Sequence, residues 1–275
     1  MGFLLEISIS HPYPKCFNPT MALSDDLLFA FEIHSPEKIR SVLAAGLDPK
    51  FPINGKAPIR ILTEMYLRSP RFVDCLQVIL DAGASLDDPF LESLLLDDSV
   101  RLRQLLQSSP NCLHRRYSLP CAFTSLQEVS ALHLCAEYNS IHCARALLDS
   151  GIDVNIRAGF DANGFGGHTA VFHAVNSNQN HCRPVMEFLV DSGANLDLRL
   201  KGLVWGSGFD WETLLFDVTP ISYAQCGLYF QFHRPEHQVY SNITYLFRKR
   251  YALDPPLRNI PNKYLQDSRV FPPRT

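Results

Sequence analysis

The sequence has no long apolar run, and no stretch approaches the roughly 18 consecutive apolar residues that a membrane-spanning helix needs. Its first residues, Met1 to Glu6, carry no basic group ahead of their short apolar run, which Glu6 ends. This is not the pattern of a secretory signal. We therefore expect a cytoplasmic protein that does not bind membranes.

Charge is also scarce. Only 19 % of the residues are Asp, Glu, Lys or Arg, and the formal net charge is −3. This balance argues against a strongly basic nucleic-acid-binding protein. The one basic run, 248–250, is interpreted as the last turn of a final helix, where cations complement the helix dipole. We expect no nucleic acid among the partners.

The sequence lacks the short motifs that hold cofactors and metals. No phosphate-binding loop or dinucleotide-binding fingerprint is present. No pair of cysteines has the Cys-x-x-Cys spacing, so we expect reduced thiols, several of them buried as small apolar residues. We accordingly expect no cofactor, no metal and no catalytic residues. The eight cysteines are Cys16, Cys75, Cys112, Cys121, Cys135, Cys143, Cys182 and Cys226.

Apolar residues, by contrast, make up 46 % of the chain, and they recur in a repeated pattern. Four times, two aliphatic residues and two variable residues precede a glycine, the pattern of an amphipathic helix that ends at a left-handed glycine. A fifth copy, Leu105–Ser109, has serine in the glycine position. Serine is strained in that conformation, so we expect this helix end to be distorted or rebuilt by Pro110. The four glycine copies are Val42–Gly46, Ile79–Gly83, Leu147–Gly151 and Leu189–Gly193.

A second motif lies upstream of these helix ends. A hydroxyl residue, a small residue or proline, an aliphatic residue and a later small residue follow one another, which suits a capped helix start and close packing of a second helix. Ala57–Leu62 and Asp25–Ala30 are weaker copies. The clearest copies are Ser130–Cys135, Thr169–Ala174 and Thr219–Ala224.

Together these residues resemble the ankyrin repeat, whose units begin T-P-L-H-x-A and end L-L-x-x-G-A. The best match is 130–155, with His133 in the histidine position of the signature. The resemblance implies an all-α solenoid of about six helix-turn-helix units with β-hairpin-like finger insertions. The predicted units begin near Asp25, Ala57, Asp88, Ser130, Thr169 and Thr219.

We therefore predict three parts of the chain. Residues 1–23 form an N-terminal extension or cap, because a solenoid must cover its ends. Residues 24–253 form the repeat domain, with matching glycines stacked as a ladder of helix pairs. Residues 254–275, which begin with Asp254 and contain several prolines, form an extended tail packed on the last unit.

The long connections 156–168 and 198–218 are the predicted fingers. Leu198, Leu200 and Leu203 alternate as in a strand, and 206–208 is the expected turn. Aromatic residues and arginine often anchor protein interfaces. The alternative interpretation is that these aromatic residues fold back against neighbouring fingers. The predicted partner-binding residues are Arg157, Phe160, Phe165, Arg199, Lys201, Trp205, Phe209 and Trp211.

The favoured function is a monomeric, non-catalytic protein-protein interaction module that binds a folded partner through the concave face and the long fingers. The sequence does not name the partner. The alternative is a metal-dependent or cysteine-based enzyme that uses the region from His168 to Cys182, where His173 and His181 also lie. That reading requires convergent ligands or an activated thiolate.

Overall fold

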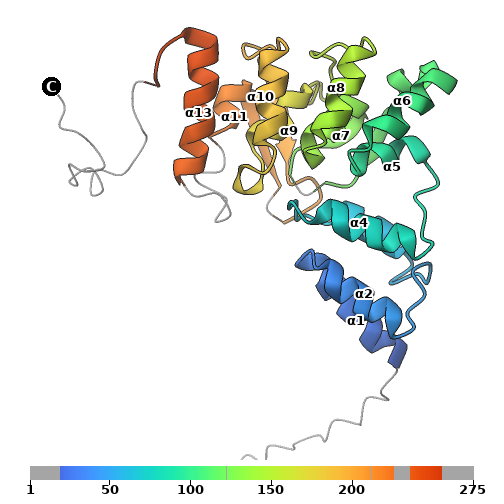
Figure 1. Ribbon diagram of the computed structural model, residues 1–275. Coiled ribbons are helices and arrows are strands. Elements are labelled where there is room, and N and C mark those ends of the chain that lie inside the picture. The colour runs from blue at the N-terminus through green and yellow to red at the C-terminus, as the bar shows by residue number, and fades with distance from the viewer. Residues whose placement is uncertain (1–18, 122, 211, 226–235, 256–275) are drawn as a thin grey trace, which may run out of the picture.

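The computed structural model describes residues 19–121, 123–210, 212–225 and 236–255. Helices follow one another in pairs along the chain (Figure 1). The pairs are α1 (Pro19–Glu32) with α2 (Pro36–Ala44), α3 (Pro58–Glu64) with α4 (Phe72–Asp81), α5 (Pro89–Leu95) with α6 (Ser99–Ser108), α7 (Ala131–Tyr138) with α8 (Ile141–Asp149), α9 (Ala170–Val175) with α10 (Arg183–Asp191), and α11 (Pro220–Tyr223) with α13 (Glu236–Tyr251).

The four predicted glycines end their helices in the same way. Gly46, Gly83, Gly151 and Gly193 have φ angles of 103°, 97°, 91° and 96°. At Gly151 the amide donates to the Leu148 carbonyl at 2.9 Å, and the next amide donates to the Leu147 carbonyl at 3.2 Å. The other three glycine turns repeat this arrangement. Left-handed φ values favour glycine because it has no Cβ, so the predicted equivalence of these positions is confirmed.

The serine copy behaves as expected. Ser109 lies at φ −145° and ψ 76°, outside the left-handed region, and a 3-10 helix, η1 (Pro110–His114), begins directly after it. The chain therefore leaves α6 by a different route from the glycine-terminated helices.

The predicted boundaries need one correction. Helix α1 already begins at Pro19, so the expected boundary between residues 23 and 24 falls inside it, and Asp25 lies mid-helix. At the other end, α13 stops at Tyr251, and Ala252 takes a left-handed φ of 56°. The tail predicted for 254–275 lies outside the described residues from 256 onward, as does the segment 1–18.

The expectation of an all-α fold was too narrow, because this helix-rich fold also contains strands. β1 (Arg116–Leu119) pairs antiparallel with β2 (Leu126–Ser130), and β3 (Leu200–Trp205) pairs antiparallel with β4 (Thr213–Val218). The turn after β3 has left-handed glycines at Gly206 and Gly208. Among the described residues, no helix is both long and apolar enough to cross a membrane.

The helix pairs do not form one unbroken ladder. Helices α8, α10 and α13 stand roughly parallel in a row, whereas α1, α2 and α4 lie crosswise to that row (Figure 1). The change of direction occurs where Asp87 and Asp88 adjoin. Asp87 is left-handed at φ 59°, and the Asp88 carboxylate caps α5 by accepting the Phe90 and Leu91 amides at 3.1 Å. The chain thus enters α5 at once, without a connecting hairpin to align the two groups of helices.

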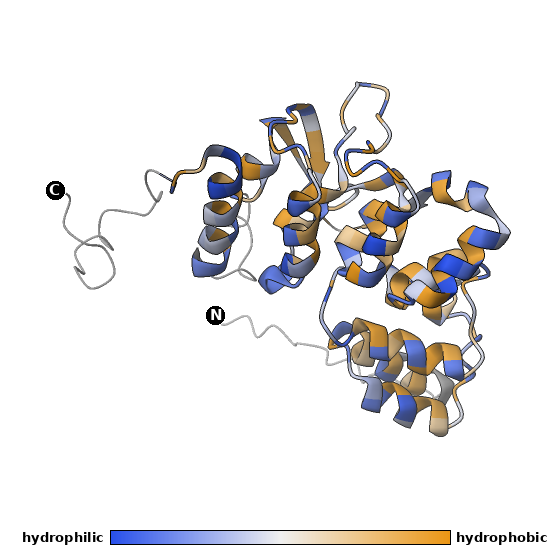
Figure 2. Cartoon of the chain, turned by 45° about the horizontal axis from the view of Figure 1, so that its top comes forward, coloured by the Kyte–Doolittle hydropathy of each residue, from blue (hydrophilic) through white to orange (hydrophobic). Residues whose placement is uncertain are grey.

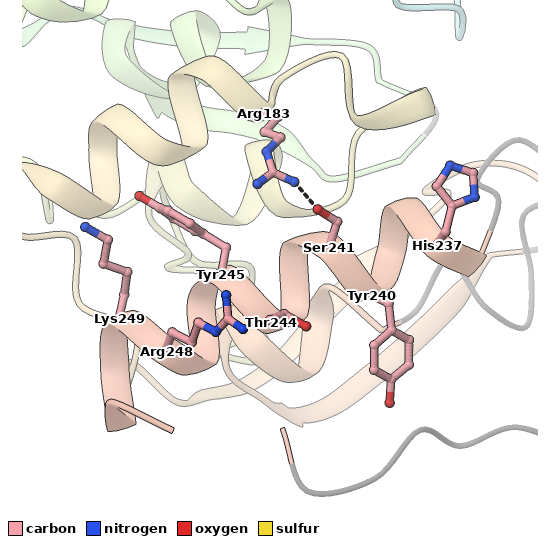
Figure 3. A pocket seen from close by; sticks show the side chains of 8 residues that line it. All are labelled: Arg183, His237, Tyr240, Ser241, Thr244, Tyr245, Arg248 and Lys249. Atoms are coloured by element: carbon pink, nitrogen blue, oxygen red, sulfur yellow. Dashed lines mark hydrogen bonds between the residues drawn. The ribbon is translucent and has the colours of Figure 1, made fainter. Parts of the chain in front are cut away.

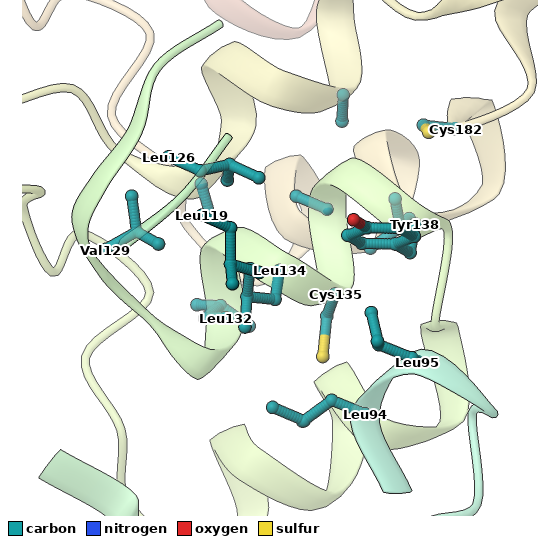
Figure 4. Close-up of a cluster of buried hydrophobic side chains, with 14 of the residues drawn as sticks. Leu94, Leu95, Leu119, Leu126, Val129, Leu132, Leu134, Cys135, Tyr138 and Cys182 are labelled. Carbon is teal, nitrogen blue, oxygen red and sulfur yellow. The ribbon is translucent and has the colours of Figure 1, made fainter. Parts of the chain in front are cut away.

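Helix α7 lies at the centre of the interior. Every residue from Ala131 to Tyr138 is buried. Figure 4 shows Leu132 and Leu134 near the hairpin residues Leu119 and Leu126. Cys135, on the same helix, lies among leucines of α5, and burial raises the pKa of its thiol well above the usual value. This helix contacts both neighbouring helix pairs, so its position sets that of the connections on either side.

Candidate functional site

Three connections pack side by side into what we call the connector layer: 116–130, 157–168 and 200–218. The Gly159 amide donates to the Glu128 carbonyl at 3.0 Å, and the Gly166 amide donates to the Gly202 carbonyl at 2.8 Å. Main-chain hydrogen bonds thus run across all three segments. Such cross-bonding holds the layer in one conformation, which reduces the entropy that binding would otherwise cost.

Two glycines allow the segments to approach this closely. A Cβ on Gly159 would collide with the Glu128 side chain, and a Cβ on Gly202 would collide with the ring of Phe165. Neither position can carry a side chain without moving its neighbour. The glycine-rich composition of the connector layer therefore serves packing as well as turning.

Most of the predicted contact residues lie at the surface. Phe160 is 58 % exposed and Phe209 is 47 % exposed, while Phe165 is half-buried. The side chains of Arg157, Arg199 and Lys201 are also exposed. Trp211 lies outside the described residues.

Trp205 is the exception, and its prediction as a displayed aromatic residue was wrong. It is 7 % exposed and stacks on Phe123, with ring centroids 5.8 Å apart and planes at 29°. Leu203, two residues earlier on the same face of β3, is fully buried. Successive side chains of a strand point to opposite faces, so the register of β3 directs both residues inward.

Aromatic rings and cations are paired on this layer. The Arg157 guanidinium lies 5.0 Å from the centroid of the Phe160 ring, and the Lys201 ammonium lies 5.1 Å from that of Phe165. The rings of Phe165 and Phe216 pack edge to face, with their centroids 5.9 Å apart and their planes at 78°. Cation–aromatic pairs of this kind hold a side chain in place without hiding it.

Phe216 was missed by the sequence analysis, although it is 64 % exposed. It lies in Thr213–Val218, a segment with several apolar residues in succession and no strict alternation. Without alternation the outward-facing residue of a strand cannot be recognised from the sequence. Its cross-strand position opposite Gly202 is what places it at the surface.

The three cations differ in their partners. Arg199 forms an ion pair with Asp217 at 2.5 Å, in which both side chains are exposed. Arg157 Nε instead donates to the Gly167 carbonyl at 2.6 Å, and Lys201 Nζ donates to the Asn163 carbonyl at 2.9 Å. Backbone carbonyls carry no net charge, so the positive charges of Arg157 and Lys201 are only partly compensated.

Residues 98–200 match the sequence profile described as "Ankyrin repeats (3 copies)". Residues 98–200 are therefore identified as ankyrin repeats. Ankyrin repeats are generally protein-interaction modules that bind through the extended surface of the stack.

Among solved structures, the chain is similar to the crystal structure of an ankyrin repeat protein. The sequence identity is 18 %, the TM-score is 0.38, and the alignment covers 81 % of this chain and 96 % of the other. No curated protein sequence matches this chain.

Within the ankyrin repeats, the predicted histidine region forms a buried polar chain. The Nε2 atoms of His168 and His173 are 3.2 Å apart, and His173 Nδ1 lies 2.9 Å from the Glu137 carboxylate. His133 Nε2 lies 3.1 Å from the His168 carbonyl, and its Nδ1 lies 2.8 Å from the Ser130 hydroxyl at the start of α7. This row of buried polar side chains thus links two neighbouring helix pairs.

This arrangement does not favour the enzyme alternative. Burial raises the pKa of the Cys182 thiol to about 12, whereas a cysteine nucleophile requires an accessible thiolate. Its Sγ instead donates to the Glu137 carbonyl at 3.4 Å. Across the described ranges, no group of three or more His, Cys, Asp and Glu side chains is arranged to hold a metal ion.

The buried histidines predict a loss of stability as the pH falls below 6.5. Burial and the nearby His173 ring lower the pKa of His133 from 6.5 to about 3, and the same causes lower that of His168. Both imidazoles are neutral when folded, so unfolding takes up protons between pH 6.5 and the folded pKa. The free energy of unfolding should therefore fall by up to about 1.4 kcal/mol per pH unit for each histidine.

Urea titrations at a series of pH values between about 7 and 5 measure this slope. His133→Gln should reduce it, because one buried imidazole is removed. The exposed His142 provides the control, and His142→Gln should leave the slope unchanged. Equal slopes in all three proteins would contradict the prediction that the buried His133 imidazole contributes to the pH dependence of stability.

A separate pocket lies between α10 and α13 (Figure 3). It is lined by hydroxyl groups, among them those of Tyr240, Ser241 and Thr244, and by several cationic side chains. Each of its guanidinium and ammonium groups is paired with a carboxylate, which weakens attraction for an anionic ligand. The pairs are Arg183 with Glu187, Arg248 with Asp254, and Lys249 with Asp191.

Proposed function

We propose that this chain acts as a monomeric, non-catalytic module that binds a folded protein through its concave face and the connector layer. The observation that carries the proposal is the exposure of Phe160 and Phe216 on a layer cross-linked by main-chain hydrogen bonds. Exposed aromatic residues on a preorganised surface are typical anchors of binding energy.

The cations next to these rings support the same conclusion. Arg157 lies over Phe160, and Lys201 lies over Phe165. A partner that covers the rings also reaches these charges, so the surface offers apolar burial and polar contacts together. Interface centres commonly combine aromatic residues with arginine in this way.

Affinity capture with matched variants tests the proposal. Phe160→Ser/Phe216→Ser removes the two exposed rings, and Phe29→Ser/Val100→Ser is the control on α1 and α6. The control residues are 50 % and 67 % exposed, against 58 % and 64 % for the connector residues. Proteins captured by the wild type are quantified for each variant after circular dichroism has shown an unchanged helix content.

We expect the control to retain the captured partner and the connector variant to lose about tenfold or more, since hot-spot aromatic residues contribute 2 kcal/mol or more each. A partner that both variants retain equally would place the binding surface elsewhere on the repeats.

A further inference from the structure

The outer edge of β4 is the clearest unused feature of the connector layer. Residues of an antiparallel pair alternate between those that bond to the partner strand and those whose N–H and C=O point away. The Gly202 carbonyl accepts a hydrogen bond from Gly166, and the Gly206 amide donates to Phe123. The main-chain N–H and C=O groups of the even-numbered residues of β3 therefore point away from β4.

The register of the β3–β4 pair shows which residues of β4 lie opposite these even-numbered residues. Gly202 lies opposite Phe216, and Val204 lies opposite Leu214. Leu214 and Phe216 must accordingly direct their own N–H and C=O groups away from β3. Within the described part of the chain, no hydrogen bond is made to these backbone groups. Among the described residues, the lateral series of hydrogen bonds that crosses the connector layer therefore ends at β4.

The side chains at this edge are apolar. Phe216 is exposed, Leu214 and Val204 are half-buried, and Phe165 lies against Phe216. Within the residues that the structure describes, none of these four belongs to the buried apolar core or packs against it. Figure 2 shows the strands of this hairpin coloured as hydrophobic along much of their length. Natural edge strands usually carry lysine, proline or other devices that prevent pairing, whereas this edge presents leucine and phenylalanine.

Charges at the tip of the hairpin distinguish one end of β4 from the other. Asp210 and Glu212 immediately precede β4, and both are exposed. Glu212 accepts the Gly208 amide at 2.8 Å, and neither carboxylate forms an ion pair with another described residue. At the opposite end of β4, Asp217 is already neutralised by Arg199. A ligand lying along β4 therefore meets uncompensated negative charge at one end only.

We propose that β4 accepts an extended segment of the partner protein as an added strand. The segment would place apolar side chains at alternate positions beside Leu214 and Phe216, and a lysine or arginine beside Asp210 and Glu212. Main-chain hydrogen bonds would supply affinity, and the apolar and charged contacts would supply specificity. The inference rests on the proposed function, since it assigns the kind of partner to the same surface.

Selection of random peptides displayed on phage against the full chain tests this inference. The selected peptides are synthesised, and their dissociation constants are measured by fluorescence polarisation for the wild type, Leu214→Pro and Leu214→Val. Proline removes the outward N–H of residue 214 but no bond of the β3–β4 pair, and prolines are tolerated on edge strands. Valine retains that N–H and an apolar side chain. Urea titration establishes that both variants are folded.

We expect selected peptides with alternating apolar residues and a basic residue at one end. Leu214→Pro should weaken their binding about tenfold or more, and Leu214→Val should bind nearly as the wild type does. Failure to select any peptide, or equal binding to all three proteins, would overturn the inference. Light scattering provides a further test, because a concentration-dependent dimer that Leu214→Pro abolishes would make a second copy of the chain the occupant.

The two proposals can fail separately. If Phe160→Ser/Phe216→Ser loses the captured protein and Leu214→Pro retains it, the module binds through its rings and strand addition is wrong. If both variants retain the captured protein, the connector layer is not the binding surface and both proposals are wrong.

Discussion

Replacement of Arg68 by methionine should lower the free energy of unfolding by about 3–5 kcal/mol, since it leaves a buried carboxylate without its cation. Arg68 Nε lies 3.2 Å from Glu137 Oε1, and the two side chains are 5 % and 8 % exposed. His173 remains as a hydrogen-bond partner of Glu137, with its Nδ1 atom 2.9 Å from the carboxylate. Urea titration of the wild type and the variant measures the difference.

Two further variants isolate the buried charge as the cause. Arg103→Met breaks an exposed ion pair with Asp149, in which the atoms are 2.8 Å apart, and should cost less than about 1 kcal/mol. Arg68→Met/Glu137→Leu removes both buried charges and should recover part of the lost stability. The prediction is wrong if Arg68→Met costs no more than Arg103→Met.

Arg68 has this weight because it lies where the two groups of helices meet. It comes from the connection between α3 and α4, and its guanidinium lies 4.4 Å from the ring centroid of Tyr138 on α7. Tyr138 in turn donates to the Thr63 carbonyl at 2.6 Å and packs against Phe72 at 5.0 Å. The crosswise helices are thus attached to the main row by one compact set of polar and aromatic contacts.

Replacement of Trp205 by alanine should also cost about 3–5 kcal/mol, the usual range for a buried large aromatic residue. The side chain is 7 % exposed and stacks on Phe123. Next to Phe123, Thr124 pairs with Trp205 as an isolated bridge between two segments of the connector layer. Loss of the indole should therefore loosen the layer as well as leave a cavity, and urea titration measures the total effect.

Phe209 provides the comparison, because it belongs to the same hairpin and is 47 % exposed. Phe209→Ala should change the free energy of unfolding by about 0.5 kcal/mol or less. A Trp205→Ala protein as stable as the Phe209→Ala protein would show that Trp205 is a surface residue after all. If the prediction holds, loss of binding in a Trp205 variant is evidence of misfolding and not of a lost contact.

The sequence predicted most accurately the features that depend on neighbouring residues. Gly151 and Gly193 end their helices at positive φ because the left-handed turn lies within a few residues of the carbonyls it satisfies. Ser130 and Thr219 cap the starts of their helices, which likewise depends on main-chain groups only a few residues away. Ser109 shows the converse, since the chain avoids the left-handed conformation where glycine is missing.

The candidate site was predicted less completely. Of the aromatic residues predicted to be displayed, Phe160 is exposed but Trp205 is buried, and the exposed Phe216 was missed. Which face of a strand points inward depends on register, and a shift of one residue reverses it. Besides its pairing with β4, the β3 segment is bonded at Gly202 to Gly166 and at Gly206 to Phe123, residues remote from it in the chain.

By itself, then, the sequence determined the phase of the repeats, the ends of their helices and the position of the long connections, because each is settled by interactions within one or two helical turns. The tertiary structure alone decided three other features: the crosswise packing of the first helices, the pairing of Arg68 with Glu137, and the choice of buried and exposed aromatic residues. Those outcomes depend on contacts between residues far apart in the chain, and burial and charge pairing exist only once such residues have been brought together.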